Sequence, residues 1–162
     1  MKKNILAALA AAAIGLVLLN ACNREKEKMT PSYTLSEQSN QEFLADNAAK
    51  NGVVKRPSGL QYRVLHAGTG KTVTSGNDLV TVTYKGWLID GKVFDQTPPG
   101  RYAQFPAGRL IPGWVEALSL MKEGDEWQIV IPSNLGYGAN GAGADIPPNQ
   151  TLVFDMKLVK VN

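Results

Sequence analysis

The residue types that most often carry enzyme chemistry are sparse in this chain. It has one histidine, His66, and one cysteine, Cys22, among 162 residues. A zinc site needs several nitrogen or sulfur ligands, and a catalytic triad needs a histidine beside a nucleophile, so we expect neither. No two carboxylates stand out as a pair facing one cleft, as glycoside hydrolysis requires. We therefore expect no metal and no cofactor, and any catalysis must come from binding geometry and polarity.

One glycine-rich segment imitates a nucleotide-binding motif. Residues Gly136–Gly141 have the GxGxxG spacing of dinucleotide sites. That spacing binds a pyrophosphate only where it opens a helix whose N–H groups point at the ligand. Here Ile146-Pro147-Pro148 follows, and these residues cannot begin such a helix. Residues 134–150 are therefore predicted to form a loop rich in glycine and proline.

The remaining candidates for chemistry are aromatic residues near strand ends and in loops. They are Tyr84, Phe94, Phe105, Trp114, Tyr137 and Phe154. Each one alone is more often a core residue than a site residue. Taken with Asp95 directly after Phe94, and with Tyr137 on the glycine loop, they indicate an apolar, aromatic-walled pocket with few polar groups.

A short helix is predicted over Pro112–Met121, between segments with strand patterns. Trp114, Ala117 and Leu118 recur at steps of three and one, and Met121 follows three residues later, so they share one apolar face. Proline suits the first turn of a helix, where its missing N–H is not needed. Trp114 stands at the helix entrance, as either core filler or pocket floor, and spacing alone favours core filler.

Alternating apolar residues predict strands on both sides of that helix. The predicted strands are 60–66, 79–89, 92–95, 126–131 and 151–161. Asp90-Gly91 is a hairpin signal, and residues 96–108 are predicted to be a loop or bulged edge that carries Phe105. One short helix among several strands predicts an α+β fold in which the sheet wraps around the helix.

The beginning of the chain predicts export. Lys2 and Lys3 precede an apolar run of 15 residues, 5–19, which is too short to span a bilayer comfortably and suits a secretory signal. We assign residues 1–21 to a signal peptide. Leu19-Asn20-Ala21-Cys22 resembles the lipobox of bacterial lipoproteins, so Cys22 is the expected lipidation site. A plain cleavable signal with an incidental thiol is the alternative.

The chain after the signal is almost electrically neutral. Without Lys2 and Lys3, it has 15 basic and 14 acidic residues from Cys22 onward, so the pI of about 9.0 does not indicate nucleic-acid binding. Residues 22–51 are predicted to be a lipid-anchored tether. They include a possible short helix over 36–50 with Ser36 as its N-cap. Residues 52–162 form the expected domain.

Several motifs in that domain resemble one enzyme family. They are Val82-Thr83-Tyr84-Lys85-Gly86, Val93-Phe94-Asp95, Ile111-Pro112-Gly113-Trp114, Leu135-Gly136-Tyr137-Gly138 and the segment 146–154. Through them the chain resembles the FKBP-type peptidyl-prolyl cis-trans isomerases over residues 52–162. The resemblance implies a strongly curved antiparallel sheet, a half-barrel, around one short α-helix.

The resemblance also implies which residues form the site. The catalytic positions are Tyr84, Phe94, Asp95, Ile111, Trp114, Tyr137 and Phe154, and the substrate-binding positions are Phe105, Leu110 and Ile146. By position, Trp114 would be the floor beneath a proline ring, and Asp95 the polar group beside the reacting imide. The Ile111 N–H and the Tyr137 hydroxyl would donate hydrogen bonds to peptide carbonyls.

The implied function is rotation of X–Pro bonds in exported proteins by an envelope lipoprotein anchored to a bacterial membrane. Its implied partners are proline-containing segments and macrolide inhibitors. The chain departs from the family at Gln96-Thr97, where two serines are common, and Arg101 is the candidate brace for the aspartate. This altered loop leaves a second hypothesis open, a chaperone or adaptor that binds proline segments with little turnover.

Overall fold

The computed structural model describes residues 32–162. The predicted signal peptide, Cys22 and the first part of the predicted tether lie outside the described residues. The sheet and its helices belong to one compact unit, Tyr33–Asn162. This unit begins well before residue 52, because the helix expected within the tether packs against the sheet. Within the described part, no helix is both long and apolar enough to cross a bilayer.

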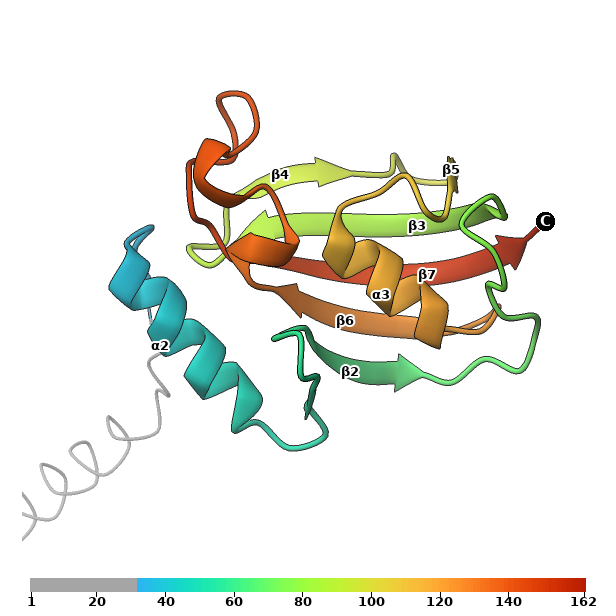
Figure 1. Ribbon diagram of the computed structural model, residues 1–162, viewed down its shortest axis with the longest axis horizontal. Helices are drawn as coiled ribbons and strands as arrows, with labels where there is room; N and C mark the ends of the chain where they lie inside the picture. Colours follow the sequence, from blue (N-terminus) through green and yellow to red (C-terminus); the bar gives the residue numbers. More distant parts are fainter. Residues whose placement is uncertain (1–31) are drawn as a thin grey trace, which may run out of the picture. The chain divides into compact units, whose positions relative to one another are not determined.

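A seven-stranded antiparallel sheet organises this unit (Figure 1). Its strands are β1 (Val54–Lys55), β2 (Gln61–His66), β3 (Leu79–Leu88), β4 (Val93–Gln96), β5 (Ala103–Pro106), β6 (Glu126–Ile131) and β7 (Leu152–Val161). The order is β1-β2-β6-β7-β3-β4, and β5 also pairs with β3. Register shifts interrupt the pairing of β2 with β6 and the pairings of β3 with β4 and with β7. Such irregularities bend strands, which agrees with the curvature of the sheet.

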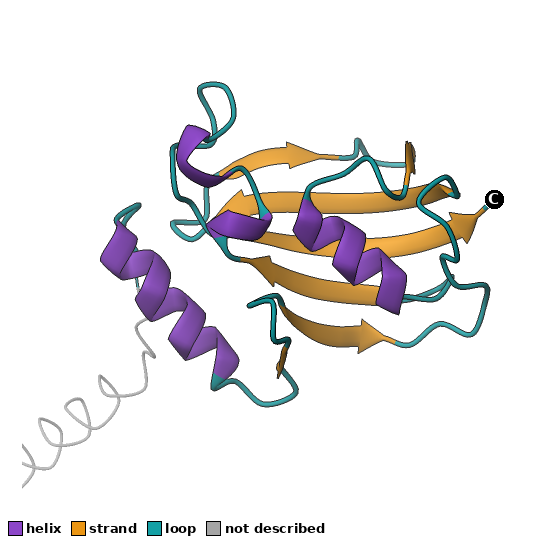
Figure 2. Ribbon diagram, viewed as in Figure 1, coloured by secondary structure: helices purple, strands orange, loops and turns teal. Residues whose placement is uncertain are grey.

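Helix α3 (Pro112–Leu120) lies across the concave face of the sheet (Figure 2). Its buried face includes Ala117 and Leu118, both 0% exposed, which join the main hydrophobic core. Gly113 lets the helix approach closely, because a Cβ there would stand 2.5 Å from Ile131 Cγ2. The helix predicted over 112–121 is therefore confirmed, and it packs as its apolar spacing indicates.

Helix α2 (Glu37–Ala48) lies against the opposite face of the sheet. Ile131 faces α3, so the next residue along the strand, Val130, points the other way. Val130 pairs with Gln61, whose amide accepts from Asn47 Nδ2 and donates to the Leu44 carbonyl, both at 2.9 Å. Because Val130 is only 1% exposed, we infer that α2 covers this end of the convex face.

The beginning of α2 follows the sequence prediction. The Ser36 hydroxyl accepts a hydrogen bond from the Ser39 N–H at 3.1 Å, as an N-cap residue does. Tyr33 folds back on the helix, where its ring meets Phe43 edge-to-face at 5.1 Å. Its hydroxyl donates to Asp46 at 2.6 Å. These contacts fix the start of the compact unit.

The predicted strands are present, each within a residue or two of its expected bounds. Two loop predictions were too simple. Residues 96–108 include β5, which pairs with β3 through residues 79–82. Residues 134–150 include a short 3₁₀ helix at Gly138–Asn140, and another lies at Ser133–Leu135. Gly138 and Gly141 have φ of 57° and 62°, so this tight winding uses glycine conformations that hydrophobic periodicity does not report.

Candidate active site

Between the concave face of the sheet and α3 there is an aromatic-walled cavity of about 200 Å³. Its lining residues are Tyr84, Phe94, Asp95, Phe105, Leu110, Ile111, Trp114, Tyr137 and Phe154. The fold thus brings together nine of the ten pocket residues predicted from the sequence. They come from β3, β4, β5, β7, α3, the loop before α3 and the loop between β6 and β7. Only a curved sheet closed by a helix places such distant segments around one cavity.

Ile146 is the predicted pocket residue that does not line this cavity. It is 6% exposed and belongs to the main hydrophobic core. Its backbone pairs with Ala142 across the turn of the 136–150 loop. In this structure Ile146 therefore supports the loop that carries Tyr137.

Trp114 is both a core residue and part of the cavity wall, the two roles that its spacing in the sequence left open. It is 5% exposed and belongs to the core, and it also lines the cavity. Its ring meets Tyr84 at 5.1 Å and Phe154 at 5.2 Å, both edge-to-face. This arrangement is the favoured one for aromatic pairs, and it holds the indole firmly against the cavity.

Gly86 on β3 makes room for two of the aromatic walls. A Cβ at this position would stand 2.6 Å from Phe154 Cε1 and 2.8 Å from Phe94 Cζ. Those two rings meet edge-to-face at 5.5 Å. Any side chain at residue 86 would displace these rings, so their close packing explains the glycine near the end of β3.

Asp95 is the only carboxylate among the residues that line the cavity. The Tyr84 hydroxyl donates a hydrogen bond to Asp95 Oδ2 at 2.6 Å. Burial and this hydrogen bond raise the pKa of Tyr84 above its ordinary value, so its hydroxyl remains a donor at neutral pH. Within the described residues Asp95 forms no ion pair, and Arg101, the candidate brace, is exposed.

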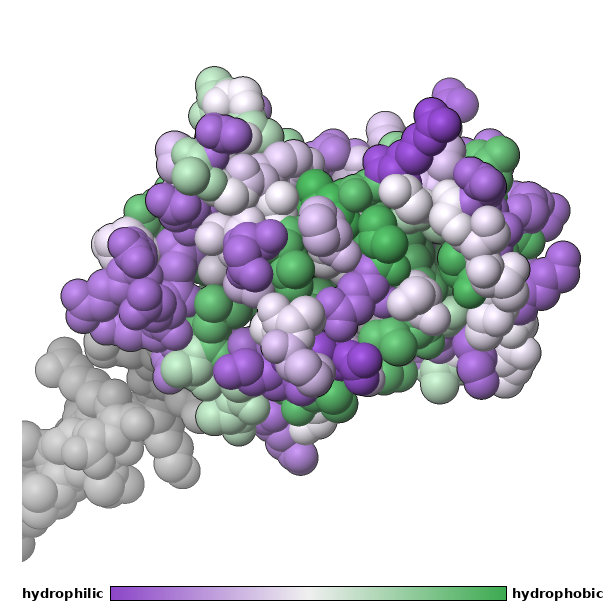
Figure 3. All heavy atoms as spheres, in the orientation of Figure 1, coloured by the Kyte–Doolittle hydropathy of each residue, from purple (hydrophilic) through white to green (hydrophobic). Residues whose placement is uncertain are grey.

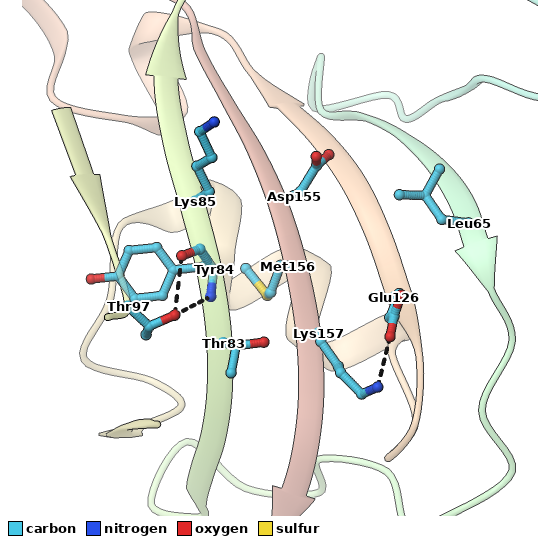
Figure 4. Close-up of a pocket in the computed structure, with 9 residues that line it drawn as sticks. All are labelled: Leu65, Thr83, Tyr84, Lys85, Thr97, Glu126, Asp155, Met156 and Lys157. Carbon is cyan, nitrogen blue, oxygen red and sulfur yellow. Dashed lines mark hydrogen bonds and ion pairs between the residues drawn. The ribbon is translucent and has the colours of Figure 1, made fainter. Parts of the chain in front are cut away.

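Thr97 positions Tyr84, a role that the sequence did not reveal. Its hydroxyl accepts from the Tyr84 N–H at 3.1 Å and donates to the Tyr84 carbonyl at 3.2 Å (Figure 4). Its own N–H donates to the same carbonyl at 2.9 Å. Thr97 therefore ties the end of β4 to β3 beside the site through its hydroxyl and its N–H.

Two donors stand at the rim of the cavity. The Ile111 N–H, just before α3, donates to no backbone carbonyl within residues 32–162. Tyr137 is 40% exposed and presents its ring from the glycine loop. Partial burial and the charge of Asp95 raise the pKa of Tyr137 above its ordinary value, so its hydroxyl also remains protonated at neutral pH. Both groups can donate to a bound carbonyl.

A larger hollow of about 380 Å³ lies on the other side of the sheet (Figure 4). Its lining includes Lys85, Glu126, Asp155 and Lys157. Lys157 and Glu126 form an ion pair at 2.6 Å, and both are more than 40% exposed. A wet, charged hollow of this kind cannot desolvate an imide, so its greater size does not make it the site. Figure 3, which views the side that carries α3, shows apolar residues among the polar ones on that side.

Comparison with known proteins gives two family matches. Residues 70–159 match the FKBP-type peptidyl-prolyl cis-trans isomerase model, and residues 3–64 match the domain found amino-terminal to such isomerases. The first match covers β3, β4, β5, β6 and most of β7 together with α3, and therefore every residue that lines the aromatic cavity.

Similar proteins come from several bacteria. The chain is 45% identical over 150 residues to a probable FKBP-type isomerase, FkpA, of Neisseria meningitidis, covering 90% of this chain and 55% of the relative. It is 48% identical over 120 residues to the outer membrane protein MIP of Legionella longbeachae, covering 74% of this chain and 51% of the relative.

A crystal structure of FkpA from Escherichia coli is also similar. It has a TM-score of 0.74 and 38% identity, covering 96% of this chain and 74% of that one. The chain spans about half the length of the curated relatives described above. With the family model matching more than half of its residues, the chain belongs to the FKBP-type peptidyl-prolyl cis-trans isomerases.

Proposed function

We propose that this protein accelerates the cis–trans rotation of X–Pro bonds in exported polypeptides. The observation that carries the proposal is the aromatic cavity, in which a single carboxylate, Asp95, stands among aromatic and aliphatic side chains. Its volume of about 200 Å³ suits a small apolar ring and its flanking carbonyls. Family membership supports the same activity.

The barrier to this rotation comes from the amide itself. Resonance gives the C–N bond partial double-bond character, and rotation costs about 18–20 kcal/mol. The planar form places charge on the carbonyl oxygen, where water stabilises it, and twisting removes that charge separation. A pocket that excludes water therefore penalises the planar form more than the twisted one. An acceleration of about a million-fold requires roughly 8 kcal/mol of this selective stabilisation.

The chain's own residues have separate tasks in this mechanism. Trp114, with Tyr84 and Phe154 against it, keeps water away from the proline ring. The Ile111 N–H and the Tyr137 hydroxyl hold neighbouring carbonyls, and Asp95 is the polar group beside the reacting imide. No proton needs to move to an enzyme group, which fits a cavity whose tyrosines are held in the protonated form.

Isomerisation is tested by two-dimensional exchange NMR on an Ala–Pro peptide with catalytic amounts of the full chain. Exchange cross-peaks between cis and trans signals should grow with protein concentration, well above the spontaneous rate. Peptide binding without faster exchange would favour the adaptor hypothesis, in which the pocket holds proline segments with little turnover. Neither binding nor faster exchange, with a folded protein, would contradict both.

We further propose that the protein is exported and anchored by a lipid on Cys22. The basic start, the apolar run 5–19 and the residues before the cysteine support this. The name of the Legionella relative places that protein at an outer membrane. Mass spectrometry of the mature protein should find Cys22 as a diacylglycerol-modified first residue. A mature N-terminus without lipid, or an unprocessed one, would contradict the anchor and leave the isomerase proposal unaffected.

A further inference from the structure

Helix α2 is attached to the rest of the unit at two separate places. Asn40 and Asn47 lie seven residues apart, hence on one helical face, and are 5% and 4% exposed. Asn47 bonds to Gln61 at the start of β2. Asn40 bonds instead to Gln150 and Thr151, at the end of the loop that carries Tyr137. The first attachment therefore joins α2 to the sheet, and the second joins α2 to the loop that borders the aromatic cavity.

Every polar atom of the Asn40 side chain is used. Oδ1 accepts from the Thr151 N–H at 2.7 Å, and Nδ2 donates to Gln150 Oε1 at 3.2 Å and to the Ser36 carbonyl at 2.8 Å. Gln150 and Thr151 are themselves 5% and 1% exposed. Buried hydrogen bonds of this kind fix a backbone position more sharply than apolar packing does, because they depend on direction.

From this contact, further hydrogen bonds lead to the rim of the cavity. Gln150 Nε2 donates to the Pro148 carbonyl at 2.9 Å. Between them, the Asn149 N–H donates to the Gly138 carbonyl at 2.8 Å, and Asn149 has a left-handed φ of 60°. Gly138 directly follows Tyr137. The path from α2 to the tyrosine thus runs through the backbone of residues 148–151.

We propose that Asn40 is a positioning residue for Tyr137, acting through residues 148–151. Among the described residues, the loop's other polar side-chain contact with a distant element is the exposed Lys92–Asp145 ion pair, at 3.1 Å, and exposed pairs contribute little. The hydroxyl of Tyr137 can hold a peptide carbonyl only if the loop returns to one position. This inference rests on the proposed isomerase function for its kinetic consequence, but the hydrogen-bond path does not depend on that function.

The test compares Asn40→Ala with Asn47→Ala in the full chain. The two variants remove the same side chain from the same helix face at nearly equal burial. Because Asn40 makes three side-chain hydrogen bonds and Asn47 makes one, both variants are assayed under conditions in which each is fully folded. Asn40→Ala should lower kcat/KM roughly three- to ten-fold, mostly through KM, because a small displacement of a positioning group weakens substrate orientation. Asn47→Ala should stay within about two-fold of the wild type. Equal losses in both variants would overturn the proposal.

A double-mutant cycle with Tyr137→Phe identifies the residue that Asn40 acts through. In the Tyr137→Phe background, Asn40→Ala should have little further effect on kcat/KM, because both changes remove the same interaction. Effects that multiply independently would overturn the proposal. Should Asn40→Ala fail to fold, Gln150→Leu breaks the next link of the path, and the same cycle applies to it.

Amide hydrogen exchange provides a readout that needs no activity. The Asn149 N–H should exchange at least about five-fold faster in Asn40→Ala than in Asn47→Ala, because only the former loosens residues 148–151. Unchanged protection of Asn149 would overturn the proposal even if the kinetics differed. If the wild type itself does not accelerate isomerisation, the proposed function fails, and exchange still decides whether Asn40 positions the loop.

Discussion

The two helices contact opposite faces of one sheet by different means. On the concave face, α3 presents Ala117 and Leu118 with an indole, and these side chains join the main hydrophobic core. On the convex face, α2 presents two buried amides, Asn40 and Asn47, which are matched to polar groups. The apolar contact of α3 keeps water out of the cavity, whereas the amide contacts of α2 fix the positions of the backbone segments that they bind.

The difference separates two requirements of the site. A cavity that eases amide rotation must be dry, and α3 with its aromatic neighbours provides that. Peptide carbonyls must also meet donors at fixed positions, and one of those donors is on a loop whose end α2 holds. Apolar packing stabilises without specifying direction, and hydrogen bonds specify direction with a smaller net gain in stability.

The largest effect should come from the concave face. Leu118→Ala removes a side chain that is 0% exposed beneath the sheet. The free energy of unfolding should fall by about 2–5 kcal/mol, from lost burial and from the cavity left behind. Urea denaturation followed by circular dichroism measures this. A loss below that of the α2 variants would contradict the view that α3 provides the main apolar contact.

A smaller effect is expected from the convex face. Asn47→Leu keeps the number and branching of the side-chain heavy atoms but leaves the Gln61 amide oxygen without its donor. The free energy of unfolding should fall by about 1–3 kcal/mol, the cost of an unsatisfied buried polar group. The same denaturation experiment measures it. If Asn47→Leu were as stable as the wild type, the amide contact would be replaceable by simple packing, and the contrast between the faces would disappear.

Inside the site, Tyr84→Phe tests the polar contact to the only carboxylate of the cavity. Loss of the hydroxyl should lower stability by about 1 kcal/mol, because water can replace it at exposed Asp95. It should also lower kcat/KM a few-fold by freeing the carboxylate. Tyr62→Phe is the matched control, since the Tyr62 ring stacks on Trp127 away from the cavity. Equal kinetic losses in the two variants would contradict the role of Tyr84.

The smallest effect concerns alkaline pH. Hydrogen bonding to Asp46 raises the pKa of Tyr33 to about 12, and burial raises that of Tyr84 as well. In the unfolded chain the pKa of tyrosine is about 10, so the folded state holds the hydroxyl protons of Tyr33 and Tyr84 more tightly. Their contribution to stability is complete below about pH 10 and is lost as pH rises toward the folded values. Tyr33→Phe should flatten this decline in denaturation midpoints, and an unchanged slope would contradict the assignment.

Much of the concave face could be predicted from the sequence. The spacing of Trp114, Ala117 and Leu118 predicted α3, and strand alternation predicted most of the sheet. Hydrophobic periodicity predicts these elements because their buried side chains are apolar. The pocket residues came from the resemblance of their motifs to a family, and all except Ile146 line the cavity.

The convex face could not be predicted in this way. Helix α2 buries asparagines, so its inner face looks like solvent-facing sequence. We expected a tether with a possible short helix there, and the helix formed, but its packing against the sheet was not predicted. Their partners Gln61 and Thr151 are distant in sequence, and no local pattern connects them. The role of Thr97 was hidden for the same reason, because a hydroxyl that clamps a neighbouring strand leaves no periodic signal.

The central claim is that X–Pro bonds rotate in the cavity lined by Trp114. One NMR titration of the full chain with a proline peptide tests it, by following the Trp114 indole N–H together with peptide cis–trans exchange. This N–H is buried and has no hydrogen-bond partner among residues 32–162, so its signal should respond to nearby changes. We predict that the indole signal shifts with the same concentration dependence that saturates the accelerated exchange. Accelerated exchange with an unmoved indole signal, or a shift confined to the charged hollow around Lys157, would contradict the account.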